Sequence, residues 1–285
     1  MTVEQAVIPA AGLGTRLLPA TKEQPKEMLP IYARDSTGKV CLKPVLQLIF
    51  EGLYSAGLRE FCFIIGRGKR AIEDHFTQDY SFMSYLRKKG IVSADELELF
   101  YQQLDDSVIS WITQPEPRGF GEAVLRAQSK VGDEDFVVHA GDACIVSEKP
   151  TYFERLTKIF ETHHQSAVLL IHEIPDPRTK GVAEVRRLEQ GRYEVLSVTE
   201  KPENPKSNFA IEPVYIFQPD FFDSLLEVPP DRTGEIQLTD GIQRIISQGQ
   251  KVRATALLEQ EVRLDVGDPE SYWEALALSY KIAKR

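Results

Sequence analysis

The sequence predicts an α/β fold in which a mixed β-sheet is flanked by helices. Through the first half of the chain, apolar runs that suit buried strands alternate with helical patterns. This order indicates parallel strands joined by crossover helices. The second half contains shorter and more numerous candidate strands, separated by turn signals rich in Gly and Pro. At 285 residues the chain is long enough to bury a large core.

The first half is expected to alternate between strands and helices. The expected strands are 5–10, 60–65, 110–113 and 135–139. The expected helices are 44–56, a short one ending at 74–76, a polar helical segment through 84–106, and 121–130. Because ligands of parallel sheets bind at the carboxyl ends of the strands, the turns after 5–10 and 135–139 are expected to share one cleft.

The second half is expected to be richer in strands. The expected strands are 167–172, 183–187, 193–198, 213–217, 251–258 and 263–266, and the expected helices are 151–164, 235–248 and 269–283. The helix 235–248 has isoleucines along one side, as an amphipathic helix requires. The last helix has Asp268 as a suitable N-cap and Pro269 at its first position.

The turn after the first strand has the composition of a phosphate-binding loop. Gly12 and Gly14 allow backbone N–H groups to point at an anion without interference from a Cβ atom. Arg16 offers a planar fork of donors, and Lys26 adds a compact positive charge. No Walker loop is present, and Leu17 stands where a dinucleotide fingerprint needs its third glycine. Two glycines alone fit an ordinary strand-to-helix turn, whereas the added cations favour a polyphosphate site.

Composition and charge exclude several classes of function. The net charge of −9 argues against a nucleic-acid partner. The cysteines Cys41, Cys62 and Cys144 are widely separated and form no Cys-x-x-Cys pair, which indicates reduced thiols. No apolar run approaches the ~20 residues of a membrane span. We therefore expect a cytoplasmic protein that does not bind a membrane.

The stretch 12–30 resembles the signature of the sugar-nucleotide pyrophosphorylases. It reads Gly-Leu-Gly-Thr-Arg-Leu-Leu-Pro-Ala-Thr-Lys-Glu-Gln-Pro-Lys-Glu-Met-Leu-Pro, and the family pattern is Gly-x-Gly-Thr-Arg-x-x-Pro-x-Thr-Lys-x-x-Pro-Lys-x-Met-Leu-Pro. Within the family it most resembles the bacterial and archaeal UTP–glucose-1-phosphate uridylyltransferases. The resemblance implies a Rossmann-like nucleotidyltransferase fold, similar to glycosyltransferase A, with a β-rich sugar-binding half. It implies a single domain, 1–285, made of a nucleotide-binding half (1–150), a sugar-binding half (151–268) and a C-terminal helix (269–285).

The implied reaction converts UTP and glucose 1-phosphate into UDP-glucose and pyrophosphate. The sugar phosphate attacks the α-phosphate in line with the leaving pyrophosphate, assisted by Mg²⁺. Because the sugar phosphate is already an anion, no general base is needed, and positioning and charge neutralisation dominate. By resemblance, Arg16 and Lys26 are the catalytic cations.

Two carboxylates are the expected Mg²⁺ ligands. Asp142 follows the strand 135–139, where the family has its metal-binding Asp, although His139 and Ala140 replace the usual Leu-Pro. Asp265, in Asp-Val-Gly, matches the second ligand of related enzymes. Mg²⁺ is usually held by one or two carboxylates together with phosphate oxygens. An Asp after a strand is by itself more often a turn residue, so both assignments depend on the resemblance.

The resemblance assigns the nucleotide to two glycine-containing loops. The phosphate loop follows the first strand, and the segment 114–123 resembles the base-recognition loop of the family. A Gln side chain there can both donate to and accept from the imide edge of uracil. On spacing alone, a Pro/Gly loop that opens the helix 121–130 is the alternative. The expected nucleotide-binding residues are Ala11, Gly12, Gly14, Thr15, Gln114, Gly119 and Gly121.

The sugar phosphate is assigned to Gly181, Glu200 and Lys201. They lie in segments that match the Tyr-Gly-Val and Glu-Lys-Pro motifs of the family. Glu200 is expected to accept hydrogen bonds from sugar hydroxyls, and Lys201 to bind the phosphate. Without the resemblance, a solvated Glu–Lys pair before a proline turn is the ordinary explanation.

The sequence departs from the family pattern in three regions. The segment 33–43 is longer than the usual connection, and its tip at Gly38 and Lys39 is expected to be an exposed loop. Glu212 and Pro213 replace a Val-Gly pair beside the expected sugar pocket, which leaves the sugar specificity open. Asp268 stands where the bacterial enzymes tend to carry a Lys, so Lys201 becomes the main cation expected for the sugar's phosphate.

Two alternative functions remain. One is a thymidylyltransferase that uses dTTP with the same sugar; the segment 84–106 favours UTP, because the thymidylyl enzymes generally lack it. The other is a non-catalytic nucleotide-sugar sensor, which the retention of the charged residues disfavours. The resemblance also implies a homo-oligomer, a dimer or a tetramer.

Overall fold

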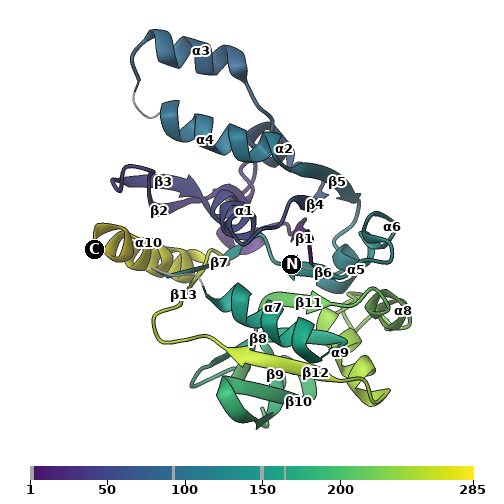
Figure 1. Cartoon of the computed structure of the whole chain (residues 1–285). Coiled ribbons are helices and arrows are strands. Elements are labelled where there is room, and N and C mark those ends of the chain that lie inside the picture. Colours follow the sequence, from purple (N-terminus) through teal and green to yellow (C-terminus); the bar gives the residue numbers. More distant parts are fainter. Residues whose placement is uncertain (1–2, 92–93, 148–150, 164) are drawn as a thin grey trace.

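A nine-stranded mixed sheet runs through the molecule (Figure 1). It is seen in a computed structural model that describes residues 3–91, 94–147, 151–163 and 165–285. Its strands are β1 (Gln5–Ala10), β4 (Glu60–Gly66), β5 (Val108–Gln114), β6 (Phe136–His139), β8 (Ala167–Glu173), β9 (Gly181–Arg187), β10 (Arg192–Glu200), β11 (Phe209–Phe217) and β12 (Val252–Ala256). They follow the order β5-β4-β1-β6-β11-β8-β12-β10-β9.

The strands of the first half are parallel. β1 pairs in parallel with β4 on one side and with β6 on the other, and β4 pairs in parallel with β5. The chain therefore builds outward from β1 in both directions. Such a reversal of strand order opens a crevice at the carboxyl ends of the two central strands. The turns after β1 and β6 meet at this crevice, as expected.

The strands of the second half extend the same sheet. β11 is antiparallel to both β6 and β8, while β12 is parallel to β8. β10 is antiparallel to β12 and to β9. One sheet thus contains parallel and antiparallel strands from both halves of the chain, which confirms the predicted fold class.

Helices cover both faces of the sheet. Successive residues of β1 alternate between two apolar cores: Ile8 belongs to one and Val7 to the other. The helices α1 (Val45–Ser55), α4 (Ala94–Asp105) and α7 (Tyr152–His163) contribute to the first core, and α5 (Phe120–Leu125), α6 (Gln128–Val131), α8 (Phe221–Leu226) and α9 (Leu238–Ser247) to the second. No helix in the described ranges is both long and apolar enough to cross a membrane.

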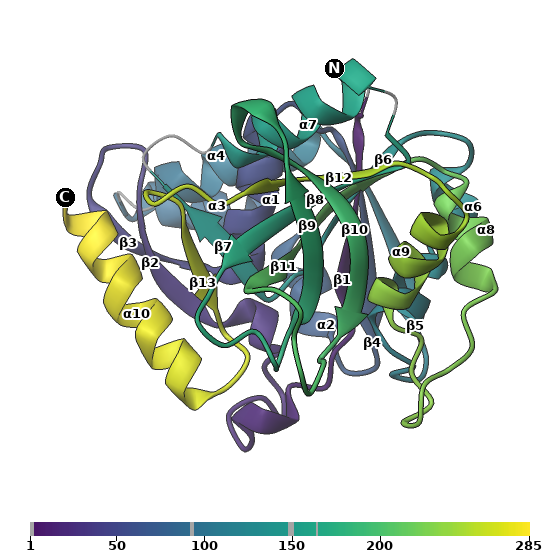
Figure 2. The ribbon, with the colours of Figure 1, turned by 90° about the horizontal axis from the view of Figure 1, so that it is seen from below.

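Two small sheets adjoin the large one near the C-terminal helix. β2 (Pro30–Arg34) pairs with β3 (Val40–Pro44), and β7 (Ala143–Val146) pairs with β13 (Val262–Asp265). The helix α10 (Pro269–Lys284) lies beside both, as Figure 2 shows. It begins with the predicted cap: the Asp268 side chain accepts a hydrogen bond from the Ser271 N–H at 2.9 Å.

Several expected boundaries were wrong. The segment 33–43 has the expected exposed tip at Gly38 and Lys39, but the strands β2 and β3 on either side of it were not predicted. The expected helix 121–130 divides into α5 and α6, because the Ala127 N–H donates to the Val124 carbonyl and tightens the turn between them. The expected helix 235–248 begins only at Leu238, because its N-cap Gln237 is extended and the Ile236 N–H donates to the Arg118 carbonyl outside the helix.

The polar segment 84–106 forms two helices that project from the body of the molecule in Figure 1. They are α3 (Tyr80–Lys88) and α4, and α3 is capped by the Asp79 side chain. Positions 92–93 of this segment lie outside the described residues. The same holds for position 164, at the end of the expected helix 151–164, and for positions 148–150, at the expected border between the halves.

Candidate active site

The crevice at the carboxyl ends of β1 and β6 holds a cavity of about 600 Å³. Its volume lies within the ordinary range for small-molecule sites. Most of the residues predicted for the site line it together: Ala11, Gly12, Thr15, Arg16, Lys26, Gln114, Gly119, Asp142, Gly181, Glu200 and Lys201. Three predicted residues, Gly14, Gly121 and Asp265, are not among the lining residues. Asp265 instead accepts a hydrogen bond from Arg263, which does line the cavity.

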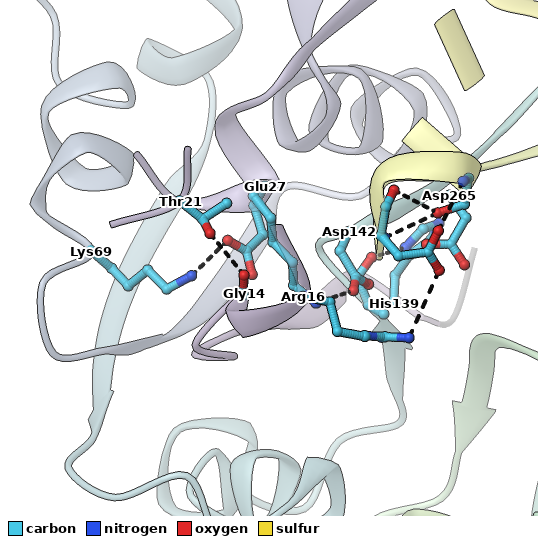
Figure 3. Close-up of polar contacts among 12 residues, drawn as sticks. Gly14, Arg16, Thr21, Glu27, Lys69, His139, Asp142 and Asp265 are labelled. Carbon is cyan, nitrogen blue, oxygen red and sulfur yellow. Dashed lines mark hydrogen bonds and ion pairs between the residues drawn. The ribbon is translucent and has the colours of Figure 1, made fainter. Parts of the chain in front are cut away.

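The phosphate-loop candidate is held in shape by a left-handed glycine. Gly14 has φ of 64°, a conformation that costs other residues energy. Its carbonyl accepts a hydrogen bond from the Thr21 hydroxyl at 2.7 Å (Figure 3). The chain then enters a short 3₁₀ helix, Thr15–Leu17, which carries Arg16. The Arg16 side chain is 70% exposed and lies 3.9 Å from the Asp268 carboxylate, so its guanidinium is accessible at the rim of the cavity.

Lys26 and Asp142 face each other inside the cavity, with 2.5 Å between Nζ and Oδ2. Burial disfavours both charges. For Lys26, the carboxylates of Asp142 and Glu27 outweigh burial and raise the pKa of the ammonium. For Asp142, Lys26 and Arg263 outweigh burial and lower the pKa of the carboxyl. Both groups are therefore charged at neutral pH.

Asp142 and Asp265 are brought together by the pairing of β7 with β13. Asp142 directly precedes β7, and Asp265 ends β13 opposite Ala143. The N–H of Val266 donates to the Asp142 carbonyl at 3.2 Å. Figure 3 shows the two carboxylates on the same side of the site. Asp142 lines the cavity and Asp265 lies next to it, and carboxylate oxygens are the donors that Mg²⁺ prefers, so the residues present fit this ion.

Two cations at this edge were not predicted from the sequence. The Arg263 guanidinium donates to Asp265 Oδ2 at 2.7 Å, and Lys180 Nζ lies 3.5 Å from the same oxygen. Both residues line the cavity. The signal in the sequence was weak: Arg263 is two residues before Asp265 in a strand, and Lys180 stands where the family motif has Tyr.

Glycines of the base-loop candidate lie against the segment that leads into α9. Gly119 has φ of 98°, and a Cβ atom there would lie 2.6 Å from the Ile236 carbonyl. A Cβ atom at Gly121 would lie 2.8 Å from the same oxygen. Neither site accepts a side chain without movement of the backbone. Gln114, at the end of β5, is 5% exposed and lines the cavity.

The sugar-side candidates lie where β9 begins, at Gly181, and where its partner β10 ends, at Glu200. Glu200 accepts a hydrogen bond from the Thr239 hydroxyl at 2.8 Å, and Lys201 Nζ lies 3.2 Å from the other oxygen of Glu200. A Cβ atom at Gly181 would lie 3.2 Å from Glu200, so the glycine leaves room for this carboxylate. The segment 234–240 was treated as mainly structural, but its Thr239 also lines the cavity.

Comparison with known proteins identifies the family. The sequence profile of the nucleotidyl transferase family matches residues 5–281. The chain belongs to the nucleotidyl transferase family. It is 38% identical over 272 residues to the UTP–glucose-1-phosphate uridylyltransferase of Bacillus subtilis, which covers 93% of this chain and 87% of the relative. It is 34% identical over 288 residues to the enzyme of the same name from Pseudomonas aeruginosa, covering 98% and 96%.

A solved structure of UDP-glucose pyrophosphorylase with UDP-glucose has the same fold. It superposes with a TM-score of 0.84 at 31% sequence identity, covering 99% of this chain and 100% of that one. The apo form gives a TM-score of 0.87 at the same identity. The resemblance noted in the stretch 12–30 is confirmed over nearly the whole chain.

A buried ion pair supports the turn that carries Lys26 in this nucleotidyl transferase. Glu27, next to Lys26, is 1% exposed, and Lys69 Nζ lies 2.7 Å from its carboxylate (Figure 3). Burial raises the pKa of Glu27, although Lys69 and Lys26 act against the shift. Lys69 directly precedes α2 (Arg70–His75). The pair therefore ties the turn that carries Lys26 to a second element.

We expect Lys69→Met to lower both stability and turnover, because it leaves the Glu27 carboxylate buried without its partner. Breaking a buried ion pair on one side costs about 3–5 kcal/mol in the free energy of unfolding. Denaturant unfolding and kcat are the measurements. The double variant Lys69→Met/Glu27→Gln should regain stability, since no uncompensated charge remains.

Arg70→Met is the matched control for this prediction. Arg70 lies next to Lys69, but its side chain is 87% exposed and its contact with Asp74 is long, at 3.6 Å. We expect it to change stability by less than about 0.5 kcal/mol. If Lys69→Met is as mild as this control, the buried pair does not support the turn.

Proposed function

We propose that this chain makes UDP-glucose and pyrophosphate from UTP and glucose 1-phosphate. The observation that carries the proposal is the cavity itself, which is lined by the glycine-containing loop after β1, the cations Arg16 and Lys26 and the carboxylate of Asp142, with Asp265 next to Asp142. The names of the relatives in Bacillus subtilis and Pseudomonas aeruginosa agree with it. The alternative, a thymidylyltransferase, differs only in its nucleotide, since dTTP carries a methyl group on the base and lacks the ribose 2′-OH of UTP.

The reaction needs little from the protein besides positioning and charge. An oxygen of the sugar phosphate forms a bond to the α-phosphorus of UTP, and the bond from that phosphorus to the bridging oxygen of pyrophosphate breaks. We assign the triphosphate to the loop 11–15 and to Arg16, whose exposed fork of donors suits phosphate oxygens. We assign Lys26 to the α-phosphate, where it neutralises charge that builds up as the new bond forms.

Asp142 and Asp265 would hold Mg²⁺. When bound, this ion neutralises phosphate charge that the protein's cations leave uncompensated. Lys26 is paired with Asp142, and Lys180 and Arg263 with Asp265, so each carboxylate has a cationic neighbour that can turn to a phosphate oxygen. The chain's own residues thus keep the site near neutrality before substrates arrive.

The sugar half of the site has more positive charge than the sequence indicated. Lys201 was the expected cation for the sugar's phosphate, and its side chain is 60% exposed at the cavity. Lys180 lines the same cavity on the side of Asp265. We propose that both lysines bind this phosphate. Lys180 then compensates for the lysine that the related bacterial enzymes tend to carry at the position of Asp268. Glu200, oriented by Thr239, accepts from sugar hydroxyls.

The decisive assay measures kcat/KM for UTP, dTTP, dUTP, CTP, ATP and GTP with glucose 1-phosphate, with and without Mg²⁺. We expect UTP to be preferred, and activity to be lost with a chelator and restored by Mg²⁺. Because one methyl in an apolar pocket is worth only about 1–3 kcal/mol, some use of dTTP is expected. A clear preference for dTTP identifies a thymidylyltransferase instead. The absence of pyrophosphate release, with UDP-glucose still bound, identifies a sensor.

We expect Lys26→Ala to lower kcat by roughly 10²–10³, the usual loss when one donor to a developing charge is removed. The protein should still fold, with a lower melting temperature, because the Asp142 carboxylate loses its nearest cation while Arg263 still favours its charge. Turnover and a thermal melt measure the two effects. A kcat near that of the wild type removes Lys26 from the mechanism.

We expect Lys201→Ala and Lys180→Met each to raise KM for glucose 1-phosphate far more than KM for UTP. The reason is that each removes one positive charge from the sugar's phosphate and none from the triphosphate. Lys206→Ala is the control, because Lys206 is 74% exposed in the same half and pairs with Glu184 outside the cavity. If either variant raises KM for UTP as much as KM for glucose 1-phosphate, the assignment of these lysines to the sugar's phosphate is contradicted.

A further inference from the structure

The amide of Gln114 is held by two acceptors. Its Nε2 donates to Glu122 Oε2 at 2.6 Å and to the Gly119 carbonyl at 3.2 Å. A carboxylate and a carbonyl can only accept hydrogen bonds, so neither can bond to the amide oxygen of Gln114, which is also an acceptor. The amide can therefore adopt only one of its two flipped orientations without losing both bonds. Within the described ranges of the chain, Oε1 of Gln114 accepts no hydrogen bond.

Glu122 is itself held in place on its other side. Its Oε1 lies 2.6 Å from Nη2 of Arg126, one turn further along the chain. The side chain of Glu122 is 12% exposed, and Glu122 is not among the residues that line the cavity. Each carboxylate oxygen thus has its own partner, one cation and one amide. Arg126, Glu122 and Gln114 form a chain of contacts that ends at the cavity wall.

We propose that Glu122, anchored by Arg126, fixes the amide of Gln114 so that the base site presents a hydrogen-bond acceptor. Glu122 is a positioning residue, because it acts through Gln114. The inference rests on the proposed function and adds the class of base: a pyrimidine whose N3 carries a hydrogen. Uracil and thymine have this N3–H, and it donates to Oε1 of Gln114.

Cytosine is rejected by the same arrangement. Its N3 carries a lone pair, so it would face Oε1 of Gln114 with an acceptor against an acceptor. If the Gln114 amide flipped so that Nε2 donated to N3 of cytosine, Oε1 would face the Glu122 carboxylate and the Gly119 carbonyl. The lost bonds and the repulsion oppose that turn. Discrimination between UTP and CTP therefore depends on a residue that does not contact the base.

The sharpest test is Glu122→Gln, which keeps the shape of the side chain. With Arg126 bound to the remaining oxygen, the new side chain directs an N–H₂ group at Gln114 and disfavours the wild-type orientation of its amide. We expect the ratio of kcat/KM for UTP to that for CTP to fall by at least about tenfold, as the loss of one well-made hydrogen bond implies. KM for glucose 1-phosphate should not change. Glu122→Ala should lower the ratio less.

Glu116→Gln is the matched control. Glu116 lies in the same loop, where its exposed carboxylate pairs with Arg118 and not with Gln114. We expect it to leave the ratio unchanged. If Glu122→Gln lowers kcat/KM for UTP and CTP equally, or changes neither, the inference is overturned. A thermal melt verifies folding; if Glu122→Gln does not fold, Arg126→Met, which frees the carboxylate, must lower the ratio instead.

The wild-type protein separates this inference from the proposed function. If it releases no pyrophosphate from UTP and glucose 1-phosphate, the proposed function fails, and calorimetric binding of UTP against CTP still tests the role of Glu122. If its kcat/KM for CTP equals that for UTP, the proposed reaction type is kept, but the inference on Glu122 is overturned.

Discussion

The contact between Lys26 and Asp142 is the constraint on which the site depends. The two residues are 116 positions apart in the chain, and their charged atoms lie 2.5 Å from each other in a crevice with little exposure. A buried charge without a partner is costly, so neither residue could remain charged here alone. Together they hold an ammonium and a carboxylate ready in the cavity. A site for phosphate transfer needs such charges in place before the substrates bind.

The same principle extends outward from this pair. Glu27 is paired with Lys69, and Asp265 with Arg263 and Lys180, so each of these acids beside the cavity has a cationic partner. The Glu27–Lys69 and Asp265–Lys180 pairs join elements that are distant in sequence, whereas Arg263 and Asp265 lie two residues apart in β13. Removing one member would therefore affect the position of the next as well as its charge, which is why the predicted effects of Lys69→Met reach beyond stability.

How much of this was predictable depends on whether the signal is local. The ends of β1 and β6 and the cap of α10 were predicted correctly, because each has a signal contained within a few residues. For the strands the signal is an apolar run followed by a turn that contains glycine, and for α10 it is the Asp-Pro pair. The strand β7 was missed, since four residues with no clear alternation carry little pattern. Its pairing with β13 is what unites Asp142 with Asp265, and only the folded chain shows it.

Glu122 illustrates the same limit inside a motif that was recognised. Gln114 and the two glycines of its loop could be aligned with the family, and Glu122 stood among them at a variable position. Its role becomes visible only when the loop folds back and places its carboxylate 2.6 Å from Gln114. Lys69 was hidden for a related reason, because its partner lies 42 positions away.

The departure at Glu212 and Pro213 can now be judged physically. The Glu212 carboxylate is buried, with one oxygen 2.5 Å from Nε of Arg263 and the other 3.3 Å from Nδ1 of His172. Pro213 lines the cavity, and its carbonyl accepts a hydrogen bond from the Ala140 N–H at 3.0 Å. The carboxylate of Glu212 is thus directed at Arg263 and is not presented to a sugar hydroxyl. Since Arg263 also holds Asp265, Glu212 acts on the orientation of the metal-ligand candidate, and the residues proposed to bind the sugar remain Glu200 and Thr239, which are hydrogen-bonded to each other.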